Sequence, residues 1–386
     1  MVVFRFVFLL LSCILLLTGC WDRKEVNDLA FVLGTGFDKL DKNKYRTSVQ
    51  VPLPGNSGQS GSSSGGGGAG GSAPYYVDSG QGRNIRESND DLQSRMSREL
   101  FFSHRRIIIF GEELARNGFH DSLDVIIEQP QSRLSSSVFV TEGKAMDILN
   151  STPHFEQFSS ETIRELAKGG VRRSVKELIN DIYNPGIDPI LPIVSKSMTQ
   201  NNDEENKKEE IEISRLAVFK DDQLGFFAST EESKGIKWII SEMDDQTYTY
   251  PVKDTKEMNI RVTNEKLKIN HTVKNNLPKF TITINLEARV EQNEADLDFD
   301  NPSEYELAIN KLESSIKKEV TSILNRSQEE GIDIAGLGYH LYQSDSLTWD
   351  KYWADDWRTI LKDTEITTKI NAEIIRNTSP GITIKE

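Results

Sequence analysis

The chain of 386 residues has little cysteine: Cys13 and Cys20 are the two that it contains. Cys13 lies in an apolar segment that we expect to be removed, so the mature protein would keep Cys20 alone. A single cysteine excludes an internal disulfide bond and a cysteine metal cluster. Stability must therefore come from the packing of an apolar core, and the length of the chain suggests two or three domains.

The sequence also lacks a hydrophobic run of membrane-spanning length. The apolar run from Phe6 to Leu17 falls short of the ~20 residues that a spanning helix needs. With Arg5 before it, this run matches the central segment of a signal peptide, which has roughly 7–15 apolar residues. We therefore expect residues 1–19 to be a signal peptide and the rest of the chain to lie outside the bilayer.

Basic residues are outnumbered, since 46 Lys and Arg stand against 60 Asp and Glu, for a formal net charge of −14. An acidic surface repels phosphate backbones, which argues against a nucleic-acid partner. It argues equally against a polybasic patch that docks on acidic lipids.

Catalytic motifs are scarce as well. The histidines form no H-E-x-x-H metal motif, and the sequence has neither a G-x-S-x-G elbow nor a Walker loop. Gly34-Thr35-Gly36 lacks the third glycine of a dinucleotide-binding turn, and Asp355-Asp356 is typical of a solvated turn. The sequence therefore predicts a protein that is not an enzyme and that holds no metal or cofactor. The scattered histidines are His104, His120, His154, His271 and His340.

Directly after the apolar run the sequence contains Leu17-Thr18-Gly19-Cys20. This aliphatic, small, small, cysteine pattern resembles a bacterial lipobox, which predicts cleavage before Cys20 and a diacylglyceryl lipid on the Cys20 sulfur. Two acyl chains anchor a protein stably where one chain binds only marginally, at about 0.8 kcal/mol per buried CH₂. The alternative is an ordinary secreted protein with a chance cysteine.

Two polar segments divide the mature chain. Residues 54–74 consist mostly of Gly and Ser, the composition of a flexible linker. A disordered loop inside the first domain is favoured over a domain boundary, because too few residues precede it to form a domain. Residues 199–210 are polar and charged without an apolar residue, which predicts a linker. We therefore expect an N-terminal α/β domain over 20–198 and a strand-rich C-terminal region over 211–386, with room for two subdomains.

Hydrophobic patterns predict strands in both regions. In the first region, its prolines would confine the strand at 189–196 to a sheet edge. In the second, long alternating segments predict an antiparallel sheet. The predicted strands are 29–37, 45–53, 106–110, 134–141 and 189–196 in the first region, and 211–220, 235–241, 258–262, 267–272, 279–291 and 365–376 in the second.

The clearest predicted element is a helix over residues 302–330. Asn301 is its N-cap, Pro302 its first residue, Glu304 completes a capping-box pattern, and Gly331 ends it. Because the polar face mixes Glu and Lys, packing on the preceding sheet is favoured over lying on a membrane. The apolar stripe of the other face consists of Tyr305, Ile309, Leu312, Ile316, Val320 and Ile323.

Four blocks of sequence together resemble a known family. They are CWDRKEVNDLAFVLGTGFDK from Cys20, HRRIIIFGEELARNG from His104, TEGKAMDIL from Thr141, and YWADDWRTILKDTEITTKINAEIIRNTSPG from Tyr352. In order and spacing they resemble the Ger(x)C lipoproteins, the C subunits of spore germinant receptors. Two departures are the long Gly/Ser tract and Glu128-Gln129-Pro130-Gln131, where a basic-acidic-Pro-acidic stretch would be usual.

The resemblance implies an α+β fold of three domains with mixed sheets, the last packing a long helix on an antiparallel sheet. It implies a lipid-anchored, non-catalytic receptor subunit on the outer face of the spore inner membrane. That subunit would dock to the integral-membrane A and B subunits and act in the response to nutrient germinants. The alternative is a solute-binding lipoprotein of a transporter, which would need two similar lobes around a cleft.

Overall fold

The structure is a computed structural model that describes residues 4–5, 25–53, 74–129, 131–200 and 207–375. The lipobox residues Leu17, Thr18, Gly19 and Cys20 lie outside the described residues, as does nearly all of the Gly/Ser tract. Of the helices in the described ranges, none has the length and apolar character to cross a membrane.

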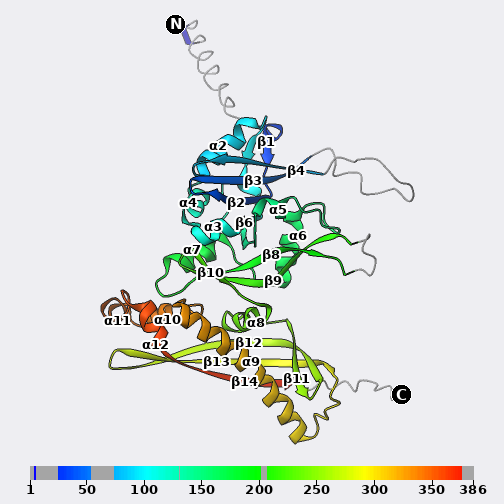
Figure 1. Cartoon of the computed structure of the whole chain (residues 1–386), viewed down its shortest axis with the longest axis vertical. Helices are drawn as coiled ribbons and strands as arrows, with labels where there is room; N and C mark the ends of the chain where they lie inside the picture. Colours follow the sequence, from blue (N-terminus) through cyan, green and yellow to red (C-terminus); the bar gives the residue numbers. More distant parts are fainter. Residues whose placement is uncertain (1–3, 6–24, 54–73, 130, 201–206, 376–386) are drawn as a thin grey trace, which may run out of the picture.

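The N-terminal part is built on a mixed eight-stranded sheet (Figure 1). In sheet order its strands are β10 (Gln223–Phe227), β9 (Glu209–Lys220), β8 (Ile190–Met198), β7 (Ser137–Val140), β6 (Ile107–Phe110), β2 (Gly34–Asp41), β3 (Lys44–Pro52) and β4 (Tyr75–Gly82). The central strands β2, β6, β7 and β8 run parallel, and antiparallel strands extend the sheet on both sides.

Helices cover both faces of this sheet and bury its central strands on both sides. Every residue of β6 and β7 is buried, as expected for continuous apolar strands of a parallel sheet. Phe110 and Phe119 pack on one face, and Phe139 and Leu149 on the other. The helices are α2 (Ile85–Arg95), α3 (Glu112–Asn117), α4 (His120–Glu128), α5 (Ala145–Leu149), α6 (Ser159–Leu166) and α7 (Val175–Tyr183). A short parallel pair, β1 (Leu29–Phe31) with β5 (Glu99–Phe101), completes this part.

The C-terminal part is a four-stranded sheet crossed by one long helix, α9 (Pro302–Glu330) (Figure 1). In sheet order the strands are β11 (Thr247–Lys253), β12 (Lys256–Lys274), β13 (Leu277–Asn293) and β14 (Glu365–Ile375). The stripe of α9 from Leu312 to Ile323 is buried in the core between helix and sheet. The predicted α+β class and the long helix packed on a sheet are therefore confirmed.

The last strand differs from the antiparallel prediction, since β14 pairs with β13 in parallel. A parallel pair needs a long crossover. The crossover here consists of α9 and three short helices, α10 (Leu337–Ser344), α11 (Ser346–Tyr352) and α12 (Trp357–Asp363).

The structure also differs from the predicted linker at 199–210. β8 precedes this segment and β9 begins within it at Glu209, and the two strands pair with each other along most of their length. The segment therefore connects neighbouring strands of one sheet, and the predicted strand 211–220 belongs to the N-terminal sheet. β8 is an interior strand because it also bridges β7. That bridge is the single pair Val140–Ile193, so a proline next to it removes little of the ladder.

Two local predictions are wrong. Residues 235–241, predicted as a strand, lie mainly in helix α8 (Thr230–Ile239), which begins with a capping box of Ser229 and Glu232. The short apolar run that suggested a strand instead supplies the buried side of a helix. At α9, Asn301 accepts a hydrogen bond from the Ser303 backbone, but Glu304 accepts one from the Asp298 backbone at 2.7 Å, so the predicted capping box is not closed.

Candidate functional site

Three of the four sequence blocks meet at the carboxyl ends of β2 and β6. The carboxylate of Asp38 accepts hydrogen bonds from the backbone of Ala145 at 2.7 Å and of Met146 at 3.2 Å, the first residues of α5. A Cβ on Gly111 would lie 2.1 Å from Asp38 Oδ1, so only glycine admits this approach. Burial raises the pKa of Asp38, and the hydrogen bonds from Ala145 and Met146 oppose that rise. Of the residues in these blocks, Asp38 therefore caps the start of α5, and Gly111 allows the backbone to pass close to the Asp38 carboxylate.

Replacing Asp38 with alanine should destabilise the protein by about 1–3 kcal/mol, because two backbone donors at the start of α5 lose their acceptor. Asp41→Ala is the matched control, since the exposed Asp41 carboxylate accepts a hydrogen bond from the adjacent Lys42 backbone and its loss should change stability by less than about 0.5 kcal/mol. Denaturant unfolding measures both variants. Equal losses in the two would contradict the capping role.

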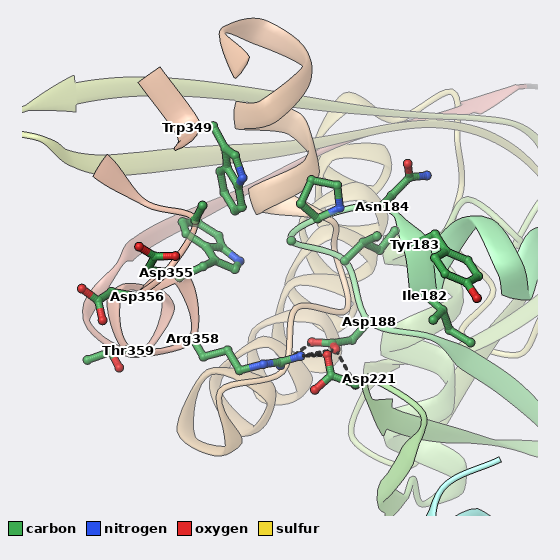
Figure 2. Close-up of a pocket in the computed structure, with 15 residues that line it drawn as sticks. Ile182, Tyr183, Asn184, Asp188, Asp221, Trp349, Asp355, Asp356, Arg358 and Thr359 are labelled. Carbon is green, nitrogen blue, oxygen red and sulfur yellow. Dashed lines mark hydrogen bonds and ion pairs between the residues drawn. The ribbon is translucent and has the colours of Figure 1, made fainter. Parts of the chain in front are cut away.

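The N- and C-terminal parts are joined by an ion pair between a buried aspartate and a partly exposed arginine, which Figure 2 shows at the centre of the view. Arg358, in α12, donates two parallel hydrogen bonds to the carboxylate of Asp188, both at 2.9 Å. It also donates to Asp221 at 2.7 Å and to the backbone carbonyl of Gly331 at 2.8 Å. The Asp188 side chain is 3% exposed. We call Asp188, Asp221 and Arg358 the joint.

Asp333 extends the joint into the C-terminal part. Its backbone donates to Asp188 at 2.7 Å, and its carboxylate accepts from the backbone of Leu337 and Gly338 and from the indole of Trp357. Burial raises the pKa of Asp333 to about 6, although these hydrogen bonds favour the charged form. The carboxylate caps the start of α10 through the backbone N–H groups of Leu337 and Gly338.

Two glycines bring the backbones of the two parts into direct contact. A Cβ on Gly186 would lie 2.5 Å from the Gly338 Cα, and Gly186 also has a φ of +69°, which favours glycine. The Tyr339 backbone donates to the Gly186 carbonyl at 2.9 Å. The orientation of the two parts is thus set by backbone packing as well as by charge.

A cavity of about 370 Å³ lies beside the joint (Figure 2). Trp349, Asp355 and Asp356 lie on one side of it, and Tyr183 and Asn184 on the other. Asp355 and Asp356 are exposed, in agreement with a solvated turn. The arginine that lines the cavity is already engaged by two carboxylates, so the arrangement suits a rigid connection better than a chemical step.

The described residues contain no group of His, Cys, Asp and Glu placed to hold a metal ion. Of the histidines, His271 and His340 are brought together, with 3.1 Å between Nδ1 of the first and Nε2 of the second. Their 69-residue separation in the chain gave no local signal for this pairing. The pair connects β12 to α10 beside the ring of Phe280.

The histidine pair predicts a pH dependence of stability. Burial, and then the neighbouring His271, lower the pKa of His340 from 6.5. The unfolded chain therefore binds a proton more readily than the folded chain, so stability is lost as the pH falls through and below the unfolded value. Between about pH 7.5 and 5, the free energy of unfolding should fall further in the wild type than in His340→Gln. Asp333, whose raised pKa contributes to the pH dependence in the opposite direction, is present in both proteins, so its contribution cancels in the comparison. Identical pH profiles of the two proteins would contradict the prediction.

Comparison with known proteins agrees with the fold and the motif geometry. Residues 22–196 match the family described as "Spore germination protein N-terminal domain", and residues 214–378 match "Spore germination B3/ GerAC like, C-terminal". The putative spore germination protein YfkR of Bacillus subtilis (strain 168) is 34% identical over 367 residues, which cover 94% of each chain. The chain belongs to the spore germination protein family. The resemblance predicted from the four sequence blocks is confirmed.

More distant relatives carry the same description. Spore germination protein KC of Bacillus subtilis (strain 168) is 24% identical over 369 residues, covering 90% of this chain and 89% of its own. The crystal structure of the GerBC protein aligns with a TM-score of 0.57 at 17% identity, covering 92% of this chain and all of that one, which supports the multi-domain fold. Membership in this family makes the chain a non-catalytic germination protein, in agreement with the sequence prediction.

Proposed function

We propose that this chain is a lipid-anchored subunit of a nutrient germinant receptor at the outer face of the spore inner membrane. It carries a diacylglyceryl group on Cys20, docks to the integral-membrane A and B subunits, and acts in the nutrient response through that contact. The observation that carries the proposal is the similarity to spore germination proteins along nearly the whole chain.

The position of Cys20 supports docking at the membrane. The first element after Cys20 is a short 3-10 helix over Val26–Asp28, which begins six residues after Cys20. So short a tether would hold the folded part at the bilayer, at an effective concentration in the millimolar range for a short flexible linker. An interface too weak to form in free solution could then form between subunits.

The architecture argues against the alternative of a solute-binding lipoprotein of a transporter. A solute-binding lipoprotein needs two similar lobes around a cleft. Here one part is a mixed eight-stranded sheet with helices on both faces, and the other is a four-stranded sheet crossed by a single long helix.

The experiment that tests the function is deletion of the gene, followed by exposure of the spores to individual nutrients. Loss of the response to at least one nutrient, measured as the fall in optical density, is expected, and the wild-type gene should restore it. The deletion is made in a strain without related genes, so that no other gene can substitute for the missing one. Unchanged responses of those spores to every nutrient tested would refute the proposal.

The anchor is tested separately by metabolic labelling with a radioactive or clickable fatty acid. The wild-type protein should take up label, and the Cys20→Ala variant should take up none. Because Cys13 would be removed with the signal peptide, Cys13→Ala is the matched control and should be labelled normally. Label on Cys20→Ala would exclude Cys20 as the lipid attachment site.

A further inference from the structure

A second cavity, a groove of about 620 Å³, lies at the end of the N-terminal part that carries β1. It is bounded by β1, the ends of β3 and β4 that border residues 54–73, and the loop after α2. β1 and α2 lie at the end of the molecule opposite the C-terminal sheet (Figure 1). Most of the lining is apolar, with Leu29, Phe31, Leu53, Tyr76 and Met96 among its residues.

The rim of the groove exposes apolar side chains to solvent. Val26 is 70% exposed, Tyr76 45% and Leu53 36%. Exposed apolar side chains gathered at one groove mark a binding surface more often than scattered single ones do. Tyrosine is also a residue that prefers the interface between water and lipid, where its ring is apolar and its hydroxyl is hydrated.

The charged residues that line the groove are basic, whereas the chain as a whole is acidic. Its lining includes Arg95 and Arg98 and no carboxylate, in a protein with a net charge of −14. Arg95 forms an ion pair with Asp91 at 2.9 Å, while Arg98 is exposed in the loop after α2. An exposed arginine beside an apolar surface suits an anionic head group next to acyl chains.

The chain length fixes how far the groove can be from the anchor. Val26 is the sixth residue after Cys20, and an extended chain advances at most about 3.3–3.6 Å per residue. The Val26 end of the groove therefore cannot be more than about 22 Å from the lipid-bearing residue. If Cys20 is acylated, the apolar rim is held within reach of the bilayer surface.

We propose that this groove rests on the phospholipid bilayer beside the anchor. Val26, Leu53 and Tyr76 enter the interfacial layer, and Arg98 contacts anionic head groups. This contact rests on the proposed lipid anchor and adds to it a second attachment, which fixes the orientation of the N-terminal part on the bilayer. The β1 end then faces the membrane and the C-terminal sheet faces away from it.

The test uses the full lipidated protein in vesicles of phosphatidylglycerol and phosphatidylcholine. The mature chain would have no free thiol once Cys20 is acylated, so a cysteine introduced by Val26→Cys or Tyr76→Cys takes an environment-sensitive fluorophore at one position. Leu347→Cys, 80% exposed in α11, and Leu277→Cys, 59% exposed at the start of β13, are matched controls in the C-terminal part.

Strong quenching by a lipid that carries a quencher in its interfacial region is expected for the labels at positions 26 and 76, with little quenching at 277 and 347. Adding Arg98→Glu should weaken the quenching at position 76 in anionic vesicles more than in neutral ones. Equal quenching at all four positions would overturn the proposal, as would none at 26 and 76. Flotation separates this failure from that of the anchor, since a protein without lipid would not float with the vesicles at all.

Discussion

Arg358→Leu is expected to lower the free energy of unfolding by about 3 kcal/mol, the low end of the range for removing one partner of a buried ion pair. The Asp188 carboxylate, 3% exposed, would keep its backbone donors but lose both guanidinium hydrogen bonds. The low end applies because the Arg358 side chain is itself 35% exposed and water can replace part of what is lost. The carbonyl of Gly331 and the carboxylate of Asp221 lose a donor at the same time.

Arg83→Leu is the control for this prediction. Arg83 also forms an ion pair, with Glu87 at 3.0 Å, but its side chain is 84% exposed. Exposed pairs contribute about 0–1 kcal/mol, so denaturant unfolding should place this variant near the wild type. If Arg358→Leu is as stable as Arg83→Leu, the joint does not hold the two parts together. Asp188→Leu combined with Arg358→Leu should recover part of the loss, because the Asp188 carboxylate is then no longer left buried without its guanidinium partner.

Loss of the lipid anchor is the second large effect that we expect. Spores that carry Cys20→Ala with a signal peptide that is still cleaved should lose most of the nutrient response, approaching spores without the gene. The reason is mass action: removing the tether replaces a millimolar effective concentration at the membrane by the much lower concentration of a diffusing protein.

Circular dichroism of the purified Cys20→Ala protein is the control, since position 20 precedes the described fold and the spectrum should match that of the wild type. A normal rate of germination with a folded, unanchored protein would mean that docking does not depend on the tether. A freely diffusing role would then have to replace the proposal.

Local sequence patterns correctly predicted those helices and strands that are determined by residues close together in the sequence. β6 is a run of four apolar residues that can only be buried, and α9 has an N-cap, an apolar stripe and a terminal glycine in order along the chain. The strand predicted at 235–241 is wrong because a short apolar run suits a buried helix as well as a strand. The Ser229 and Glu232 spacing was the signal that would have decided it.

The joint could not be predicted, because its cause is not local. Asp188 and Arg358 are 170 residues apart, and nothing near either residue indicates the other. The same holds for Gly186 and Gly338, whose need for glycine arises only when the two parts pack. The sequence blocks contain Asp38, Gly111 and Ala145, but only the structure shows that Asp38 contacts the other two.

The most direct test of the account is capture of the tagged protein from detergent-solubilised spore membranes, followed by identification of what is bound. We expect two integral-membrane proteins, corresponding to the A and B subunits, to be recovered with the wild-type chain and to be depleted with Cys20→Ala. Recovery of the wild-type chain alone under conditions that keep other membrane complexes intact, or with the permease of a transporter, would contradict the account.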